Sequence, residues 1–387
     1  MLPFSRLLNR PFFFWILMVQ FMCTRNFAQV NNKTTYQFRL MIGTYTNSGK
    51  SEGLYTYRFD SKDGSAVFLN KTNASDPSFL TMGKNNRVLY AVNELGGGKG
   101  SVSAFRYTHN TGEITLLTTV PSGGDHPCYI TTDRKHRYAF VANYTGGSFS
   151  AIRINTNGFP DSSIQTILHN GKSVTARQEK AHVHSTVLSP DEKYLLVQDL
   201  GTDQITVYAV DLTASANPVT TAPVSVYNTV PGSGPRHLVF HPNKKWAYVV
   251  QELNGTVTGL SFKKGILKKI QDISLHAAAV TGNDGAADIH ISPDGKFLYA
   301  SNRGTFNEIT VYSISAKGEL NYRGTVSTLG KAPRNFCIDP SGNFLLVGNH
   351  LSDEIVVFKR NQSTGLLTDT GKRIQTGAPV CIRFFQD

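Results

Sequence analysis

The chain has 387 residues, a formal net charge of +12 and four cysteines. Its basic residues are scattered over predicted turns instead of forming runs. This scatter excludes the clustered basic patch that is usual in nucleic-acid-binding proteins, while the net positive charge favours a small anionic ligand. The sequence has no Cys-x-x-Cys pair and no cysteine spacing typical of a zinc site, so we interpret Cys128, Cys337 and Cys381 as buried free thiols.

The first 28 residues have the pattern of a secretory signal peptide. Arg6 and Arg10 precede an apolar run, Pro11–Cys23, and Ala28 provides a small residue for cleavage before Gln29. An apolar run of about 13 residues is shorter than a membrane-spanning helix needs. We therefore expect export to the periplasm or medium as a mature protein without a membrane contact, with a retained N-terminal anchor as the alternative.

The remainder of the chain is built from one repeated pattern. In the segment 232–260, three short apolar strands are separated by a His-Pro-Asn-Lys turn and an Asn-Gly turn, as in antiparallel sheets. The pattern begins again at the following positions: Pro77, Pro127, Val183, Pro235, Ala286, Pro333 and Pro379. Successive starts are 50, 56, 52, 51, 47 and 46 residues apart. Such a period is typical of the four-stranded blades of a β-propeller.

Six complete repeats occupy residues 77–378, and the remaining segments combine into a seventh. Residues 38–76 supply three strands, and residues 379–387 supply one inner strand. We therefore predict an all-β, seven-bladed propeller over residues 38–387, without an internal domain boundary. Pairing of the C-terminal strand with the N-terminal blade would close the ring and leave no long unpaired edge.

The start of each inner strand and the end of the second strand should lie on the same face of the ring, beside the central channel. The turns between these strands lie on the opposite face, so we interpret His241, Asp294 and Asp339 as turn formers. On the channel side the pattern places seven charged or titratable side chains: His184, Asp199, Arg236, Glu252, Arg303, Arg334 and His350. Folding does not require charge there, so their convergence predicts a functional site.

Several polar residues at or near the channel ends of the strands also have a purely structural interpretation. The asparagines at the strand ends are typical of turn caps, and His237 and His290 would pack between blades. Arg236 and Arg334 carry the planar fork that suits carboxylate or phosphate, although pairing with carboxylates across the channel is the alternative.

His182 lies two residues before His184, and the two could share a metal ion. No carboxylate follows them on the same strand, so the pattern is weak. We predict no metal and place His182 among the substrate-binding residues.

On several motifs the chain resembles the lactonase family of seven-bladed propellers, typified by the propeller-type 6-phosphogluconolactonase. The motifs include MIGTYT, EKAHVHS, GPRHLVFHP, ISPDGKFLYASNRG and PRNFCIDPSGNFLLVGNHLSD. They extend over essentially the whole chain after the predicted signal peptide. The family is related to the carboxymuconate lactonizing enzyme, whose proposed channel residues would match His184, Arg236, Glu252 and Arg303.

The resemblance implies ring opening of a sugar δ-lactone, such as 6-phosphogluconolactone, without a metal or organic cofactor. Either His184 or Glu252 would be the base that activates water, and Arg236 and Arg303 would polarise the carbonyl or bind the anionic end. Four further residues would bind substrate: Arg334, which would take a phosphate or carboxylate, and His350, Asp199 and His182.

Two alternatives remain open from the sequence. One is a cycloisomerase, or a lactonase for another acid lactone, that uses the same residues. The other is a non-catalytic exported propeller that binds a carbohydrate or a protein. The predicted export signal differs from the cytosolic location expected of pentose phosphate lactonases, so an unphosphorylated lactone is a further candidate substrate.

Overall fold

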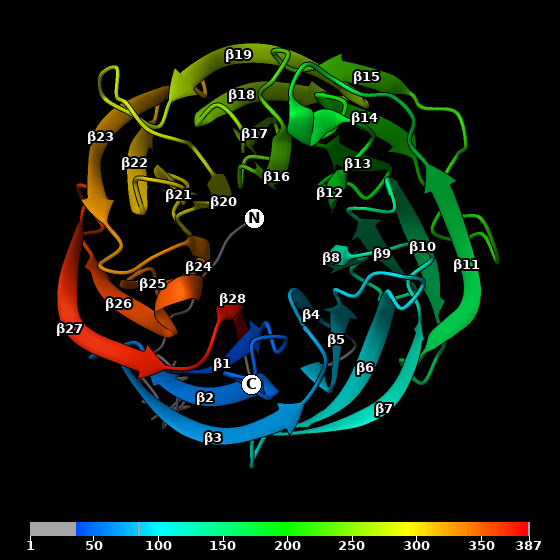
Figure 1. Ribbon diagram of the computed structural model, residues 1–387, viewed down its shortest axis with the longest axis horizontal. Helices are drawn as coiled ribbons and strands as arrows, with labels where there is room; N and C mark the ends of the chain where they lie inside the picture. The colour runs from blue at the N-terminus through cyan, green and yellow to red at the C-terminus, as the bar shows by residue number, and fades with distance from the viewer. Residues whose placement is uncertain (1–35, 84–85, 386–387) are drawn as a thin grey trace, which may run out of the picture. The chain divides into compact units, whose positions relative to one another are not determined.

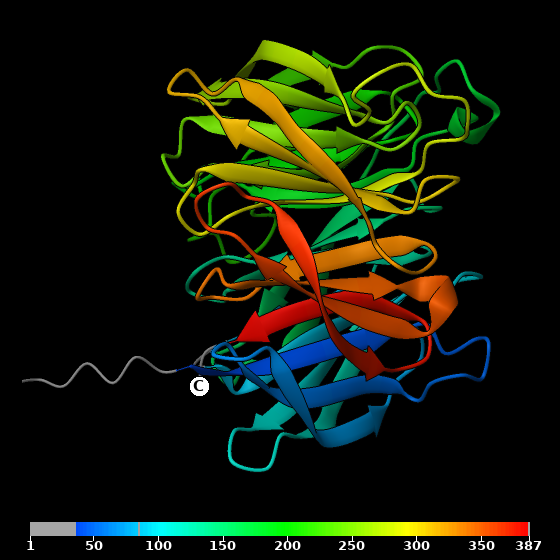
Figure 2. The same cartoon turned by 90° about the vertical axis from the view of Figure 1, so that its left-hand side faces the viewer.

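The computed structural model describes residues 36–83 and 86–385; the predicted signal peptide lies outside these ranges. Residues 36–83 and 86–385 form a ring of seven antiparallel sheets, each with four strands (Figure 1). In the perpendicular view the strands run across the thickness of the ring (Figure 2). The predicted all-β, seven-bladed propeller is confirmed.

In each blade the four strands follow one another from the channel outward. Blade 1 contains β28 (Pro379–Phe385), β1 (Gln37–Thr44), β2 (Gly53–Asp60) and β3 (Ser65–Asn73). Blade 2 contains β4 (Leu80–Met82), β5 (Val88–Asn93), β6 (Ser101–Thr108) and β7 (Glu113–Pro121). Blade 3 contains β8 (Pro127–Thr132), β9 (Tyr138–Asn143), β10 (Ser148–Ile154) and β11 (Pro160–Leu168). Blade 4 contains β12 (Val183–Leu188), β13 (Tyr194–Asp199), β14 (Gln204–Ala209) and β15 (Ser225–Asn228).

The remaining blades repeat this order. Blade 5 contains β16 (Pro235–Phe240), β17 (Trp246–Gln251), β18 (Thr256–Lys263) and β19 (Ile266–Ser274). Blade 6 contains β20 (Ala286–Ile291), β21 (Phe297–Asn302), β22 (Glu308–Ile314) and β23 (Leu320–Ser327). Blade 7 contains β24 (Pro333–Ile338), β25 (Phe344–Asn349), β26 (Glu354–Arg360) and β27 (Leu367–Gln375). Two short 3₁₀ turns are η2 (Ala176–Gln178) and η3 (His350–Ser352).

The C-terminal strand closes the ring as predicted, because β28 pairs antiparallel with β1 from Arg39 opposite Phe385 to Thr44 opposite Pro379. The inner strands begin at the predicted residues, except that β4 begins at Leu80 instead of Pro77. The backbone at Ser78 turns back there, since its N–H donates to the carbonyl of Asp76 at 2.8 Å.

The core lies between the blades. The second strands β5, β9, β21 and β25 are buried at all six positions because a neighbouring blade covers each face. This explains their continuous apolar sequences, whereas outer strands such as β3 are partly exposed. Among the described residues, no helix is long and apolar enough to cross a membrane.

The turns between the first and second strands are held by their own side chains, as predicted. Asp339 accepts the backbone N–H of Phe344 at 2.6 Å, and Asp294 accepts that of Lys296 at 3.1 Å. His241 accepts a backbone N–H in the same way at 3.0 Å. These three residues therefore shape turns, and the site lies at the opposite ends of the same strands.

Candidate active site

A β-bulge near the start of several inner strands releases one side chain from the pairing of the sheet. In β12, Val183 pairs with Asp199 and Ser185 pairs with Gln198, so His184 is the extra residue. The same shift makes Arg236 the extra residue in β16 and Arg334 the extra residue in β24. A bulge releases a side chain from the alternation of the sheet and re-aims it.

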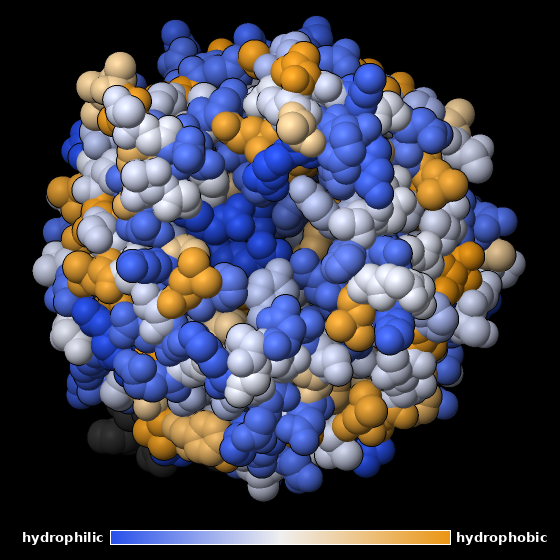
Figure 3. Space-filling view, in the orientation of Figure 1, coloured by the Kyte–Doolittle hydropathy of each residue, from blue (hydrophilic) through white to orange (hydrophobic). Residues whose placement is uncertain are grey.

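The residue that follows each second strand supplies a second position at the same end of the channel. Glu252 follows β17, Arg303 follows β21 and His350 follows β25. The same position is occupied by Glu94 after β5 and by Tyr45 after β1. Hydrophilic side chains gather in a hollow at the centre of the ring (Figure 3).

Glu252 is the centre of this site, and three arginines contact its carboxylate. The Nε atom of Arg236 donates to Oε2 at 2.8 Å, and Nη2 of Arg177 donates to Oε1 at 2.8 Å. Nη2 of Arg303 lies 3.2 Å from Oε2. The Arg236 and Glu252 side chains are only 1% and 5% exposed, whereas that of Arg177 is 53% exposed.

The electrostatics of this cluster keep Glu252 ionised. Burial alone would raise the pKa of the Glu252 carboxyl, but the guanidinium groups of Arg303, Arg236 and Arg177 lower it to about 2. Burial lowers the pKa of Arg236 to about 10, and the charges of Arg303 and Arg334 act in the same direction. Glu252 is therefore a fixed anion held by hydrogen bonds and has little basicity at neutral pH.

His184 is buried beside this cluster and carries no charge at neutral pH. Burial, followed by the charge of Arg236, holds its pKa well below the ordinary value of 6.5. Its Nδ1 atom lies 3.8 Å from the thiol of Cys128, whose own pKa is raised by burial. Among the described residues nothing hydrogen-bonds Nε2 of His184, so this nitrogen is available to a ligand.

Arg334 forms the other side of the site. Its guanidinium lies over the ring of Tyr45 at 5.3 Å and 3.6 Å from Oε2 of Glu94, which accepts the Tyr45 hydroxyl at 2.9 Å. Within the described part of the chain the guanidinium makes no hydrogen bond. His350 contacts the Tyr45 ring, and burial, with the charges of Arg334 and Arg303, lowers its pKa to about 4. The pair Arg303 and Arg334 therefore gives this side a positive potential.

Two predicted substrate-binding residues are engaged by neighbouring groups. Both oxygens of Asp199 are used locally: Oδ1 accepts the backbone N–H groups of His182 and Gly201, and Oδ2 contacts Nδ1 of His169 at 3.0 Å. The ring of His182 stacks on Tyr144 and contacts a glutamate of the preceding loop. Asp199 therefore caps a turn, as the strand-end asparagines do, and His182 lies against Tyr144 beside the site; that these two residues bind substrate stays a prediction.

A second polar cluster lies next to the site, around Asp288 in β20. Its Oδ1 contacts Nδ1 of His237 at 2.8 Å, and its Oδ2 contacts Nε2 of His290 at 2.9 Å and Nδ2 of Asn335 at 2.5 Å. His237 and His290 do pack against neighbouring blades, as predicted. The sequence did not reveal that one buried carboxylate joins them.

No group of three or more histidine, cysteine, aspartate or glutamate side chains within residues 36–83 and 86–385 could hold a metal ion. Both histidines pack on the Tyr144 ring, but the two ring nitrogens of His182 contact the Tyr144 carbonyl and a glutamate, whereas Nδ1 of His184 faces Cys128. The adjacent pair in the sequence is therefore no chelating pair in the structure.

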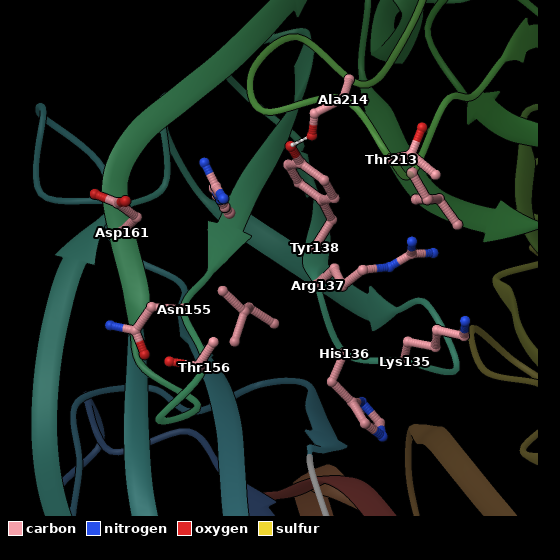
Figure 4. A pocket seen from close by; sticks show the side chains of 12 residues that line it. Lys135, His136, Arg137, Tyr138, Asn155, Thr156, Asp161, Thr213 and Ala214 are labelled. Atoms are coloured by element: carbon pink, nitrogen blue, oxygen red, sulfur yellow. Dashed lines mark hydrogen bonds between the residues drawn. The ribbon is translucent and has the colours of Figure 1, made fainter.

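A separate groove of about 680 Å³ lies at the edge of blade 3, beside the turn between β8 and β9. Its basic side chains include Arg137, whose Nε is 3.1 Å from Asp133. Tyr138 donates to the carbonyl of Ala214 at 2.7 Å, and Asp161 and His136 lie apart on different sides of the groove (Figure 4). Unlike the corresponding groups of the channel, the histidine and the carboxylate of this groove are not brought together.

Three residues of the site were missed by the sequence analysis. Tyr45 and Glu94 occupy the strand-end position of Glu252, so applying the repeat to blades 1 and 2 would have found them. Arg177 belongs to η2, in the loop between β11 and β12. That loop has no counterpart in the other repeats, and no periodic signal marks it.

Comparison with known proteins agrees with this architecture. The family model described as "Lactonase, 7-bladed beta-propeller" matches residues 39–384. A 6-phosphogluconolactonase of Formosa agariphila is 35% identical over 351 residues, which cover 89% of this chain and 99% of the relative. A 6-phosphogluconolactonase of Bacillus subtilis is 34% identical, with 89% and 97% covered.

Solved structures of similar sequence also share this fold. A structure titled as a putative 6-phosphogluconolactonase of Bacteroides fragilis is 37% identical, with a TM-score of 0.87, and covers 92% of this chain and 99% of its own. A periplasmic gluconolactonase of Pseudomonas aeruginosa is 36% identical, with a TM-score of 0.85 and coverage of 90% and 99%. The chain therefore belongs to the lactonase family of seven-bladed β-propellers.

Proposed function

We propose that this protein hydrolyses a sugar δ-lactone to the corresponding aldonic acid, with 6-phosphoglucono-δ-lactone as the first candidate substrate. The observation that carries the proposal is that an uncharged histidine, His184, and a carboxylate held by three arginines, Glu252, both lie beside Arg236. The relatives named 6-phosphogluconolactonase support the same chemistry.

In the proposed reaction, Nε2 of His184 accepts a proton from a water molecule as the water oxygen attacks the lactone carbonyl. The carbonyl π electrons move onto oxygen, and Arg236 and Arg303 stabilise the resulting oxyanion. When the tetrahedral intermediate collapses, the ring C–O bond breaks. The departing alkoxide takes the proton back from the imidazolium, and the product acid then ionises in water.

The site supports His184 as the base in preference to Glu252. A carboxylate with a pKa of about 2 accepts a proton poorly at neutral pH. Burial, followed by the arginine charges, opposes protonation of His184 in the free protein. The negative charge that develops on the substrate would offset these charges, so protonation becomes easier as the reaction proceeds. Glu252 instead holds the arginines in their positions.

Arg334 is the proposed contact for an anionic group of the substrate. Its guanidinium is largely buried, makes no hydrogen bond within the described residues, and has a carboxylate partner only at 3.6 Å. A guanidinium fork with unused donors suits phosphate or carboxylate. His350 and Tyr45 would line the same part of the site.

Unphosphorylated gluconolactone is the second candidate substrate, because one similar structure is titled a periplasmic gluconolactonase. We also propose that the chain is exported, on the signal-like pattern of residues 1–28. Amino-terminal sequencing of the protein recovered from a cell fraction tests this: a start at Gln29 would support export, and a retained Met1 in the cytosol would contradict it.

The deciding experiment measures hydrolysis of 6-phosphoglucono-δ-lactone and glucono-δ-lactone by the purified protein, corrected for spontaneous hydrolysis and repeated with a chelator. Chelator-insensitive preference for the phosphorylated lactone would support the first candidate substrate, and preference for the neutral lactone would support the second. Activity that the chelator abolishes would contradict the proposed mechanism. If neither lactone is hydrolysed faster than in buffer, the chain is better explained as a binding protein.

A further inference from the structure

The seven inner strands surround the channel, which runs from the candidate active site to the opposite face of the ring (Figure 1). Because these strands repeat one pattern, equivalent positions lie at a similar depth in the channel. The side chains two residues after each repeat start form one such layer, which we call the waist: Phe79, Tyr129, Ser185, His237, Asp288, Asn335 and Cys381. All of them except Tyr129 are buried, so little solvent reaches this depth.

Aromatic rings close the waist across the channel. The ring centres of Phe79, which precedes β4, and Tyr129 in β8 lie 4.1 Å apart. The ring of His237 in β16 lies 5.8 Å from the former and 5.3 Å from the latter. These residues belong to blades 2, 3 and 5, and blade 4 separates blade 5 from the other two around the ring, so the rings meet in the channel itself. The waist therefore divides the channel into two ends.

The layer two residues further along each inner strand lies beyond the waist. It contains the following side chains: Thr81, Thr131, Val187, Val239, His290, Cys337 and Arg383. All of them except Cys337 are partly exposed. Because the waist is buried, solvent reaches these side chains through the face opposite the candidate active site. We call this end of the channel the second mouth.

Arg383 of β28 carries a permanent positive charge at the second mouth. Its Cζ lies 4.7 Å from the centre of the Phe79 ring, which covers one face of the guanidinium. Its Nε is buried and hydrogen-bonds no atom in the described part of the chain. The guanidinium also forms no ion pair with a carboxylate of residues 36–83 or 86–385. Among these residues, Arg383 therefore has no directly bonded counter-ion.

Asp288 is a carboxylate whose charge acts on Arg383 through space, but its oxygens are used elsewhere. Oδ1 contacts Nδ1 of His237 at 2.8 Å, and Oδ2 contacts Nε2 of His290 at 2.9 Å. The two oxygens also accept the backbone N–H groups of Ile289 and Phe336. A carboxylate held in this way is not free to turn toward Arg383, so the guanidinium keeps donors for an external acceptor.

We propose that the second mouth binds a small oxyanion, a phosphate or a carboxylate group, through the guanidinium of Arg383, with the hydroxyl of Tyr129 as a further donor. A guanidinium fork with unused donors suits either group. Burial raises the pKa of the Tyr129 hydroxyl, and the charge of Arg383 acts most strongly in the opposite direction, so the two groups are close. The waist separates this ligand from the candidate active site, so the proposal does not depend on lactone hydrolysis.

Histidine side-chain ¹⁵N NMR of the intact protein tests the site, with inorganic phosphate titrated at constant pH and ionic strength. His290 is 24% exposed and reports on the second mouth, whereas His350 contacts Tyr45 and reports on the active-site end. We expect a saturable shift of the His290 signals. Its apparent Kd should rise at least about tenfold in Arg383→Met and change less than about twofold in Arg334→Met.

Three further variants make this test specific. Arg58→Met removes the same charge from an exposed position of β2 in the same blade, and should leave the apparent Kd at His290 unchanged within about twofold. Tyr129→Phe keeps the ring of the waist but removes the hydroxyl, and should raise that Kd about two- to tenfold. His290→Gln assigns the reporter signals, because they disappear. If thermal unfolding shows that Arg383→Met does not fold, Tyr129→Phe still decides.

Three results would overturn the inference. One is an absence of any saturable response at His290 to phosphate and, in a parallel titration, to acetate, which presents a carboxylate. Another is an equal Kd at His290 in the wild type and in Arg383→Met. The third is loss of the His290 response in Arg334→Met, which would place the anion at the active-site end. A response to one anion alone would support the site and identify the group that it prefers.

Discussion

Arg236 and Glu252 form a buried ion pair in which Nε donates to Oε2 at 2.8 Å, between the start of one strand of blade 5 and the end of the next. The antiparallel hairpin places these two ends side by side, with Pro235 opposite Gln251. The bulge at Arg236 then turns its side chain toward the residue after β17. The pair is thus a direct product of hairpin register.

Removing one partner of this pair should destabilise the protein strongly. In Glu252→Gln the buried guanidinium of Arg236 loses its counter-ion, and we expect the free energy of unfolding to fall by about 3–5 kcal/mol. Urea denaturation measures the change. Arg177→Gln is the control, because this exposed partner of Glu252 should contribute only about 0–1 kcal/mol. Equal losses of unfolding free energy in the two variants would contradict the importance of the buried pair of Arg236 and Glu252 for stability.

His184→Ala tests the proposed base. Without a proton acceptor at this position, kcat/KM should fall about 10²- to 10⁴-fold. Initial rates at pH 7 with either lactone, corrected for spontaneous hydrolysis, measure the loss. His182→Ala is the matched control, since its ring packs on Tyr144, and it should lose less than about tenfold. A loss of less than about tenfold in His184→Ala would rule out the proposed base.

Stability should fall as the pH is lowered below about 6.5. The pKa of His184 is well below this value and that of His237 is about 3, so the unfolded chain binds protons that the folded state does not. For His237, stability therefore rises with pH between about 3 and 6.5, by up to about 1.4 kcal/mol per pH unit, and His184 adds to the loss of stability as the pH falls below about 6.5. Glu252, with a pKa of about 2, adds a further loss below about 4.5. Urea denaturation of His237→Gln should show a shallower slope; an unchanged slope would refute this.

Arg334→Met should change substrate preference. Losing a charged hydrogen bond to phosphate should raise the KM for 6-phosphoglucono-δ-lactone at least about tenfold, and the KM for glucono-δ-lactone less than about twofold. Arg153→Met, in the groove at the edge of blade 3, is a control of equal charge change. Equal effects on both lactones would place the anionic group elsewhere.

Ring closure should be required for folding. Deleting residues 378–387 removes β28 and exposes the edge of β1, so we expect an insoluble or unfolded protein. A circular permutant should recover solubility if residues 378–385 are joined ahead of residue 36 by a short turn, since Phe385 lies opposite Arg39. Far-ultraviolet circular dichroism and thermal unfolding measure both. A folded truncated chain would contradict the role of β28.

The fold could be predicted because each repeat marks its own strand ends. Apolar runs, turns and the Pro or small residue at each start recur in register, and the pairing of β28 with β1 follows from incomplete repeats at the two chain ends. The short β4 could not be predicted, because it depends on the carbonyl of Asp76, which accepts the N–H of Ser78. The left-handed backbone of Asp76 is shared by His126, Ala332 and Ala378, which precede strands that begin at the expected proline. Nothing in the repeat signals that local turn.

The site was predictable wherever a residue occupies a repeated position. His184, Arg236, Arg303, Arg334 and Glu252 all fall on such positions and do converge. Asp199 differs for a physical reason: it ends β13, where five of the other blades place asparagine or glutamine, and its carboxylate caps the same kind of turn. Arg177 and the link from Asp288 to His237 depend on loop conformation and side-chain rotamers, which periodicity does not encode.

The bulge near the start of the inner strands also allows the channel residues to change in evolution without a change in the packing between the blades. A substitution at His184 or Arg334 alters the wall of the channel, while the residues on either side of it keep their partners in the sheet. Selection can therefore change the chemistry of the channel without altering the apolar faces that hold the blades together. Related propellers would be expected to diverge first at these bulged residues, and a comparison restricted to them would sort the family by substrate better than overall identity does.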